Sequence, residues 1–582
     1  MRRVGRFAIV MLVLIMSATC FAGCGDKYGG KTPIKFYAYG SDEEAQVYNQ
    51  IVDTYNKTNT DNVYVEVEYF PSTGYENMID KMLAGASGPD IIFVGERYIK
   101  RWAKFGYLEN LQSRIEASNV DLDDMWYSNV QRHRYNPAKN TNNADDDLYC
   151  LPKDVSPTAL YYNKTVIEAQ GIKIISVDED KIDAFNNEGA ADNTGKTKAD
   201  YGIEGTVLKK GFQRDNPYNG LSWTKPTYGA NGKVLETMIF NNRIPMSWDE
   251  VEDLGMILTK KANSDLKDPS GNMEWGYFTE WWFNYGWGVG GDCAVDTTGE
   301  GDWEFTLGDT KRKCLLYNSD GSYAYNDLHQ NIFVDSDKIS EYPLKDGQYF
   351  GQPLPSMREA FDRFVQLSCT RNNRGVAVAP TPAQLGTSTY RKFFTQGKVG
   401  LMVQQNYIIN MMRAAIGNSF DWDVAPLPMY KEYVDINGDE VKNHGICIGH
   451  SGSASAGIWT GSKHKDEAFS FVAYMCGPES QTLISHTGST MCNQRSLVEK
   501  EYIEPLTSGG LPPQNVRVFA EYADIQRPGD WWYMPDDAWI DEWANVLNTS
   551  VRNGTMTVDQ MFAEKTASTQ AILEKYKTGG IL

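Results

Sequence analysis

The sequence predicts an α/β fold built on an open, mostly parallel sheet. Residues 34–94 alternate β-rich and helical segments in the order β-α-β-α-β, which is typical of sheets with helices on their faces. The third strand of this unit, 89–94, is apolar enough to be buried on both faces, as parallel strands are. Helical periodicity then returns at 247–262, 356–369, 465–476 and 555–576.

The first unit can be assigned element by element. Residues 34–39 form a β-rich run that ends at Gly-Ser-Asp, where Ser41 is a suitable helix N-cap. Apolar residues recur at helical spacing over 47–55, a second strand is expected at 63–69, and a second helix at 75–83. Because ligands bind beyond the carboxyl ends of the strands in such sheets, we expect binding groups there.

The middle of the chain is interrupted twice. Residues 178–234 and 290–355 are polar and glycine-rich, so we expect two surface insertions on a smaller core. Between them, Ser247 and Glu250 have the spacing of a capping box, which predicts the start of a helix. The segment 435–440, DINGDE, is better explained as a hairpin turn than as a calcium loop.

The N-terminus has the pattern of a secretory signal. A charged start precedes an apolar run at 7–16, which is too short to span a bilayer. Phe-Ala-Gly-Cys24 then matches the bacterial lipobox, in which the cysteine is lipidated and becomes the mature N-terminus. We therefore expect a signal peptide at 1–23 and a lipid tether at 24–33. An ordinary signal peptide cut elsewhere, with Cys24 incidental, is the alternative.

Composition limits the possible partners. A net charge of −20 argues against nucleic acid, whose phosphates need Lys and Arg contacts. No later segment is apolar enough to cross a membrane, so we expect membrane contact through the lipid anchor only. Of the nine cysteines, Cys20 leaves with the signal and Cys24 carries the lipid. For the other seven, a disulfide between Cys293 and Cys314 and buried free thiols both remain open.

No enzyme or cofactor-binding motif that the sequence partly matches has the spacing or context that it requires. Residues 286–291 spell G-x-G-x-x-G, but a dinucleotide-binding turn must open a helix, and no helix is favoured after Gly291. The segment 189–197 nearly matches a phosphate-binding loop but has one residue too many between its glycines. The six histidines lack zinc-binding spacing. We predict no cofactor, no metal site and no enzymatic activity, although motifs alone do not exclude a glycosidase, which needs two carboxylates.

Six segments, taken in order, resemble the substrate-binding components of ABC importers, the large family that includes the maltose-binding protein. One carries the strand GPDIIFV and the helix after it, another the Tyr-Asn of a crossover strand, and a third the strand VGLMV. The other three match two return strands, the helix that follows them, and the last helix. The six segments are 88–111, 151–164, 393–409, 422–428, 452–475 and 553–573.

This resemblance implies a periplasmic-binding-protein-like fold, in which two α/β lobes joined by a hinge close on a ligand in the cleft. The first lobe would comprise 34–152 plus 420–476, and the second 153–419 plus 477–582. The resemblance also implies a monomer that captures a sugar, of which an oligosaccharide is the expected kind, and delivers it to ABC transporter permease subunits. The lipid would hold the protein at the extracellular face of the cell membrane, in a bacterium without an outer membrane.

The resemblance also implies where the ligand is held. Some candidate residues follow the first and third strands, and others lie at the start of the segment that crosses between the lobes. A third group precedes a glycine pair that is expected to form a second crossover turn. The rest follow the strand at 399–403 or belong to the tryptophan-rich C-terminal segment. Aromatic rings would stack on the apolar face of a sugar, and polar groups would bind its hydroxyls. The implied ligand-binding residues are Ser41, Asp42, Glu96, Arg97, Lys153, Asp154, Glu280, Trp281, Trp282, Gln405, Tyr407, Trp531, Trp532 and Trp539.

Two points stay open at this stage. Alternation along the chain sends only one of Trp281 and Trp282 towards the cleft, and the sequence does not say which. A receptor for oligopeptides or another solute, and a cell-surface carbohydrate-active enzyme, are the alternatives to a sugar-binding protein. A peptide receptor needs charged partners for the peptide termini, whereas an aromatic-rich cleft favours sugars.

Overall fold

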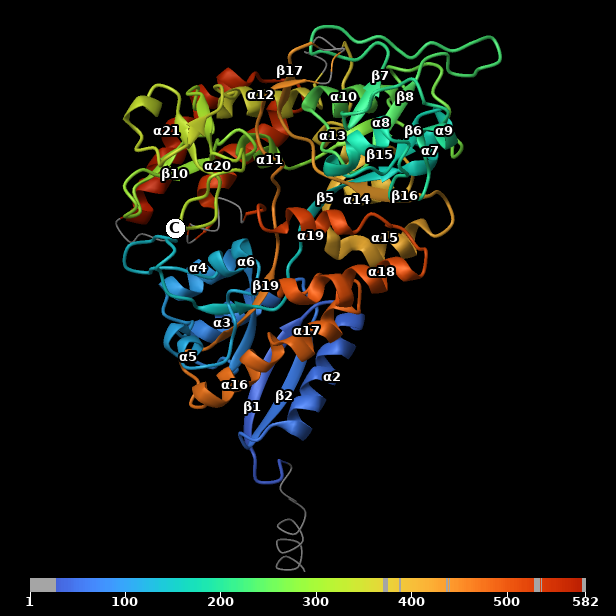
Figure 1. Cartoon of the computed structure of the whole chain (residues 1–582). Helices are drawn as coiled ribbons and strands as arrows, with labels where there is room; N and C mark the ends of the chain where they lie inside the picture. The colour runs from blue at the N-terminus through green and yellow to red at the C-terminus, as the bar shows by residue number, and fades with distance from the viewer. Residues whose placement is uncertain are drawn as a thin grey trace, which may run out of the picture.

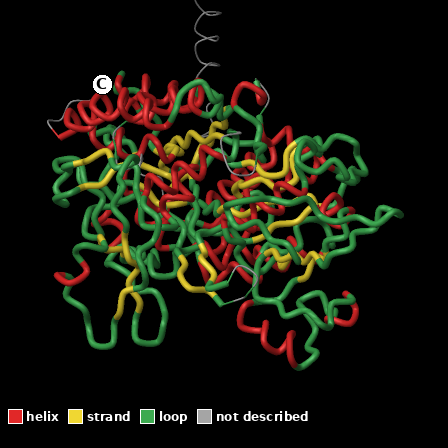
Figure 2. Tube along the Cα trace, turned by 90° about the horizontal axis from the view of Figure 1, so that it is seen from above, coloured by secondary structure: helices red, strands yellow, loops and turns green. Residues whose placement is uncertain are grey.

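The computed structural model describes residues 28–369, 375–386, 389–435, 438, 440–527, 534 and 536–577. They form two lobes, one above the other in Figure 1, joined by crossing segments. Viewed from above, loops and turns make up much of the outer rim (Figure 2). The predicted signal peptide, Cys24, Trp531 and Trp532 lie outside the described residues. Within the described part of the chain, no helix is both long and apolar enough to cross a membrane.

The first lobe is built on a five-stranded sheet in the order β2-β1-β3-β19-β4. Strand β1 pairs in parallel with both β2 and β3, which confirms the predicted α/β unit. Strand β19 runs antiparallel to β3 and to β4, because it belongs to a later passage of the chain through the lobe. The strands are β1 (Thr32–Tyr39), β2 (Val63–Phe70), β3 (Ile91–Gly95), β4 (Cys150–Pro152) and β19 (Ala454–Ile458).

Helices pack around this sheet and bury its apolar strands. The helix α2 begins at a capping box, in which Ser41 Oγ accepts a hydrogen bond from the Glu44 amide at 3.2 Å and the Glu44 carboxylate accepts one from the Ser41 amide. The predicted tether at 24–33 overlaps β1, which starts at Thr32 because its backbone pairs with β2 from that residue on. The helices are α2 (Asp42–Thr58), α3 (Tyr75–Ala84), α4 (Glu96–Lys104), α5 (Gln112–Glu116), α6 (Tyr127–Gln131), α16 (Lys465–Met475) and α17 (Pro478–Ser485).

The second lobe is built on a four-stranded sheet in the order β16-β5-β15-β9. Here the structure corrects a boundary: the sequence assigned 420–476 to the first lobe, but β16 pairs with β5 in the second sheet. The chain returns to the first sheet only at β19. A short, fully buried strand such as β16 fits either sheet by composition, so its partner could not be inferred locally. The strands are β5 (Thr158–Asn163), β9 (Trp275–Phe278), β15 (Val399–Gln405) and β16 (Trp422–Ala425).

The boundary at 477 also shifts, because α17 lies against α2 and α16 in the first lobe. The predicted helix starting at the Ser247 capping box is present as α10. The other helices of the second lobe are α7 (Lys164–Ala169), α10 (Trp248–Ile257), α11 (Trp282–Trp287), α12 (Met357–Gln366), α13 (Pro382–Leu385), α14 (Tyr390–Thr395), α15 (Ile409–Ile416), α18 (Glu504–Ser508), α19 (Arg517–Ala523), α20 (Ala538–Val546) and α21 (Val558–Lys577).

Both regions expected as insertions carry regular elements of their own. Around the first, β7 pairs with β8, which also pairs with β6; the second contains two further small sheets. The predicted hairpin near 435–440 is formed by β17 and β18. These elements are β6 (Lys173–Ile175), α8 (Ile182–Asn187), α9 (Lys198–Tyr201), β7 (Phe212–Arg214), β8 (Met238–Asn241), β10 (Ala294–Asp296), β11 (Trp303–Phe305), β12 (Lys313–Tyr317), β13 (Phe333–Asp335), β14 (Tyr349–Phe350), β17 (Lys431–Tyr433) and β18 (Val441–His444).

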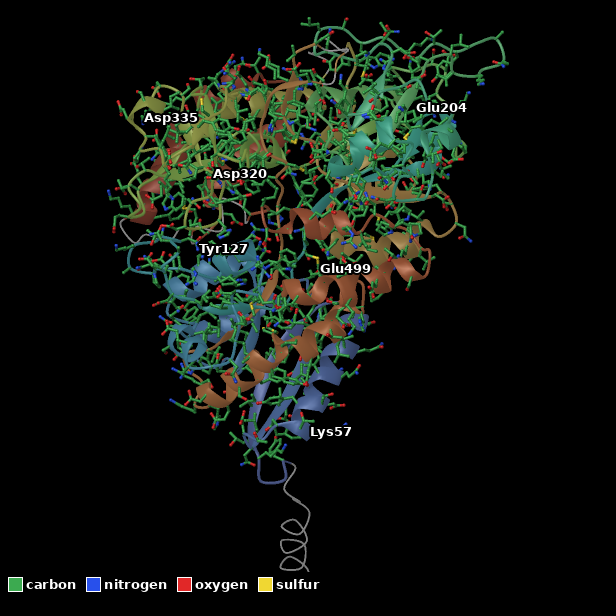
Figure 3. The ribbon with its side chains drawn as sticks, in the orientation of Figure 1. Lys57, Tyr127, Glu204, Asp320, Asp335 and Glu499 are labelled. Carbon is green, nitrogen blue, oxygen red and sulfur yellow. The ribbon has the colours of Figure 1, made fainter. Side chains whose placement is uncertain are left out.

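The second insertion contacts the first lobe. Tyr127, labelled on the upper part of the first lobe in Figure 3, stacks on His329 with ring centroids 3.8 Å apart. Lys139 and Glu300 form an ion pair at 2.7 Å. The insertion therefore bridges the two lobes outside the hinge.

The cysteines of the described residues are buried thiols. Of the two possibilities for Cys293 and Cys314, the structure therefore has thiols and not a disulfide at these positions.

Candidate ligand-binding cleft

A cleft of about 700 Å³ lies between the lobes, against the segments that connect them. This volume is within the roughly 300–1,000 Å³ of typical ligand pockets. The walls come from the ends of β1 and β3 in the first lobe and from α11, β15 and α20 in the second. Its lining residues include Tyr39, Ser41, Glu44, Glu76, Glu96, Arg97 and Tyr98 from the first lobe, Trp282, Gln405, Tyr407, Asp537, Ile540 and Asp541 from the second, and Lys153, Asp154, Ser156, His450, Gly452, Ser453 and Thr490 from the connections.

Glu96 and Arg97 follow β3 and serve different purposes. The Glu96 carboxylate accepts hydrogen bonds from the Arg132 guanidinium and from the Ser453 amide. Burial raises the pKa of Glu96 to about 7, because the loss of hydration outweighs the attraction of Arg132. Arg97 instead forms an ion pair with Asp537 of the second lobe. This pair therefore links the two walls of the cleft.

Lys153 and Asp154 form a buried ion pair at the start of the first connection, with Nζ 2.5 Å from Oδ2. The Lys153 ammonium also lies 5.3 Å from the ring centroid of Phe93. The Asp154 carboxylate accepts a hydrogen bond from the Ala454 amide at 3.2 Å. Because each charge already has partners in the protein, this pair mainly holds the connection in place.

Two aromatic side chains line the wall of the second lobe. Tyr407 is 38% exposed, and its hydroxyl accepts a hydrogen bond from Arg391. Trp282 is 8% exposed and packs edge to face on Trp543, with ring centroids 5.2 Å apart. The Arg391 guanidinium also lies over the Tyr407 ring, 5.2 Å from its centroid. Tyr407 therefore offers a partly exposed ring, while Trp282 contributes a mostly buried part of the wall.

Of the adjacent pair, Trp282 lines the cleft and Trp281 does not. Trp281 is half-buried against Phe283 and His450, with centroids 5.8 Å away in each case. Glu280 is an exposed residue and is also outside the lining residues. Loss of hydration near surrounding protein atoms raises the pKa of its carboxyl, although the charges of Arg552 and Arg391 lower it. Of the expected pair of Glu280 and Trp282, only the tryptophan therefore lines the cleft.

The expectation for Trp539 is corrected by the structure. Trp539 and Trp543 lie one helical turn apart on α20 and are both fully buried in the second lobe. Ile540 and Asp541, on another face of the same helix, line the cleft instead. Asp42 is the first residue of α2 and is exposed outside the lining. The segment that carries the tryptophans does contribute to the lining of the cleft, but the register of the helix decides which of its side chains reach it.

Sequence reasoning missed the residues that reach the cleft without belonging to a motif. Glu76 comes from the first turn of α3, and Tyr39 is the last residue of β1, so their positions at strand and helix ends were an available signal. Ser156, His450 and Thr490 come from separate connections, and no local pattern marks them.

The glycine-rich segment follows a helix and does not open one. Gly286 lies within α11, where a Cβ would be 2.2 Å from Met357 Sδ. Gly290 has φ +79°, and a Cβ there would be 2.4 Å from the Phe333 ring. These glycines permit close packing inside the second lobe, so the expected crossover between lobes is not at this turn.

Comparisons with known proteins agree with this architecture. The profile of the family described as bacterial extracellular solute-binding protein matches residues 50–505. No curated protein sequence matches the chain.

Solved structures with the same fold cover almost the whole chain. One is the ABC substrate-binding protein Lmo0181 from Listeria monocytogenes in complex with cycloalternan, with a TM-score of 0.55, 14% identity, and coverage of 94% of this chain and 99% of that one. Another is the cyclic alpha-maltosyl-1,6-maltose binding protein from Arthrobacter globiformis, with a TM-score of 0.55, 15% identity, and coverage of 94% and 100%. A third is the sugar-binding protein MalE from Xanthomonas citri, with a TM-score of 0.54, 15% identity, and coverage of 94% and 98%.

Proposed function

Because the chain belongs to the bacterial extracellular solute-binding protein family, we propose that it captures an oligosaccharide and delivers it to the permease of an ABC importer. The cleft carries this proposal. A partly exposed aromatic ring, Tyr407, lies on one wall, and hydroxyl, carboxylate and amide groups line the rest. Sugars need this combination, because their C–H faces are apolar and their edges are hydroxylated.

The paired cations of the cleft favour a neutral sugar over the C-terminal carboxylate of a peptide. Arg97 and Lys153 are the cations among the described residues that line it, and they are paired with Asp537 and Asp154. A peptide C-terminus would have to displace one of these carboxylates. A neutral sugar needs no such exchange.

We also propose that the protein binds without catalysis. A glycosidase needs two carboxylates that are free to act on the substrate. Glu96 has a raised pKa, as a general acid would, but its carboxylate is held by Arg132 and the Ser453 amide. These contacts indicate that Glu96 holds the surrounding segments in place and does not act on the ligand.

The membrane anchor remains part of the proposal. Strand β1 starts at the end of the first lobe that points away from the second lobe (Figure 1). A lipid on Cys24, a few residues earlier, would attach the protein there and leave the cleft between the lobes accessible. Cys24→Ala is expected to release the protein into the medium, and retention on the membrane would refute the anchor.

The experiment that tests the ligand class is calorimetric titration of the purified protein with neutral oligosaccharides and with a peptide pool. Chromatography of the sugars after incubation tests for turnover. We expect saturable binding of at least one oligosaccharide with no change in its length. Binding of peptides alone would favour the peptide receptor, and shortened sugars would favour the enzyme.

A further inference from the structure

The second insertion, 290–355, reaches the first lobe with the turn between β10 and β11. Glu300 in this turn pairs with Lys139 at 2.7 Å, and Trp303 Nε1 donates a hydrogen bond to the Asn140 carbonyl at 3.4 Å. Trp303 is 9% exposed, so the contact includes a buried aromatic side chain as well as surface charges. The insertion and the first lobe therefore touch at a place outside the segments that connect the lobes.

One glycine of this turn allows the insertion to approach the backbone of the first lobe. Gly301 has φ +88°, and a Cβ there would collide with the Lys139 carbonyl oxygen. Gly299 has φ +72°, but nothing among the described residues, its own chain neighbours aside, comes within 4 Å of a Cβ placed there. A side chain at Gly301 would therefore push against the first lobe, whereas one at Gly299 would meet only the backbone strain that both positions share.

Another part of the insertion contacts the first lobe through an aromatic stack. The His329 ring stacks on Tyr127 with centroids 3.8 Å apart and, within the insertion, on Tyr325 at 5.8 Å. His329 has φ +52°, which is uncommon for a residue with a side chain. Asn326 Oδ1 holds this turn by accepting a hydrogen bond from the Gln330 amide at 2.9 Å. The turn therefore presents His329 to the first lobe in a preset conformation.

The turn between β10 and β11 is also fixed to the second lobe. The Gln570 side chain on α21 donates to the Trp303 carbonyl at 3.1 Å and accepts from the Phe305 amide at 2.9 Å. Asp302 pairs with Lys577 at the end of the same helix. Because β11 is held along α21, the turn moves with the second lobe. Its contacts with the first lobe must therefore break when the lobes separate.

We propose that the second insertion is a strap that holds the two lobes together before any ligand binds. The cleft is then already formed in the unliganded protein, and the strap contacts break when the lobes separate to admit or release a ligand. Apparent affinity rises with the fraction of molecules in the binding-competent arrangement, so the strap strengthens binding without touching the ligand. This inference goes beyond the proposed function, because it holds for any ligand of the cleft.

Small-angle X-ray scattering of the unliganded protein tests the strap directly. The unmodified protein is expected to have the radius of gyration of the structure with its lobes in contact. Gly301→Ala places a Cβ against the first lobe and is expected to shift the radius of gyration to a larger value. Gly299→Ala is the matched control, because it adds the same backbone strain without the collision, and it should leave the radius unchanged.

A charge exchange gives a second test that leaves the backbone unstrained. Lys139→Glu and Glu300→Lys, each alone, set like charges opposite each other and are expected to increase the radius of gyration. The variant that carries both changes restores the pair and should return the radius of the unmodified protein. The two side chains are 49% and 59% exposed, so neither change should prevent folding.

An unliganded protein that is already open would overturn the strap, as would a radius of gyration that Gly301→Ala, Lys139→Glu and Glu300→Lys all leave unchanged. Equal opening in Gly299→Ala and Gly301→Ala would assign the effect to local strain and also contradict the proposal. For the ligand that the titrations identify, Lys139→Glu is expected to raise Kd by at most about fivefold. The scattering needs no ligand, so failure of the strap and failure of the proposed function can be told apart.

Discussion

Arg97 in the first lobe and Asp537 in the second form an ion pair that joins the two walls of the cleft. The Arg97 side chain is 64% exposed, so water and salt screen the pair. Its position matters more than its energy, because it connects the two lobes at a point where ligand contacts are expected.

Removing this pair tests whether it helps to keep the cleft closed. Arg97→Gln is expected to weaken ligand binding by at most about fivefold, since exposed ion pairs contribute roughly 0.2–1 kcal/mol. The loss should be smaller at high salt, because the pair is already screened there in the unmodified protein. Calorimetry at two salt concentrations measures both effects. Glu499→Gln, which breaks the exposed pair with Arg517 (Glu499 is labelled in Figure 3), is the control and should leave Kd unchanged.

Tyr407 is predicted to supply the ring on which the sugar stacks. Tyr407→Ala should raise Kd by about tenfold or more, because it removes both the buried apolar area and the stacking contact. Tyr407→Phe keeps the ring and loses only the hydrogen bond from Arg391, so it should bind almost normally. Equal losses in the two variants would show that the hydroxyl, and not the ring, contacts the ligand.

Trp539 is predicted to affect folding and not the ligand. It is fully buried on α20, so Trp539→Phe and Trp539→Ala should lower the free energy of unfolding, the second by roughly 3–5 kcal/mol. Urea unfolding followed by fluorescence measures the loss. At temperatures where Trp539→Phe is still folded, its Kd for the ligand should equal that of the unmodified protein. A higher Kd would indicate that Trp539 contacts the ligand.

Glu96 makes stability depend on pH. Its pKa of about 7 in the folded protein exceeds the roughly 4.3 of an unfolded glutamate, so the folded state binds more protons between these values. The free energy of unfolding should therefore fall as pH rises from about 4.3 to about 7, by at most roughly 4 kcal/mol from this group.

Glu96→Gln should remove this part of the pH dependence. Urea unfolding at pH 5 and pH 7.5 would measure the difference between the variant and the unmodified protein. Asp423, whose burial raises its pKa to about 6, contributes in the same direction and is retained in both proteins, so the comparison isolates Glu96. A pH dependence that Glu96→Gln leaves intact would assign the effect to other groups.

Local patterns were sufficient to predict the β-α-β-α-β unit of the first lobe. The alternation of β1, α2, β2, α3 and β3 depends on apolar patterns among residues that are close in sequence. The capping box at Ser247 likewise predicted the start of α10. The resemblance pointed to Glu96, Arg97, Gln405 and Tyr407, at the ends of β3 and β15, and all four line the cleft.

What the sequence could not specify depends on contacts between distant segments. The pairing of β16 with β5 is decided by the second sheet and not by the residues of β16. The family resemblance placed Trp539 in the cleft, whereas the register of α20 turns it into the core. Ser156 and Thr490 become neighbours only through the bridge between Val155 and Met491.

The central claim is that a sugar is held between the lobes, and a crystal structure with the tightest-binding oligosaccharide tests it most directly. We expect one sugar ring on the face of Tyr407 and sugar hydroxyls within hydrogen-bonding distance of polar side chains that line the cleft. Sugar density outside the cleft, or a cleft occupied by a peptide instead, would contradict the account.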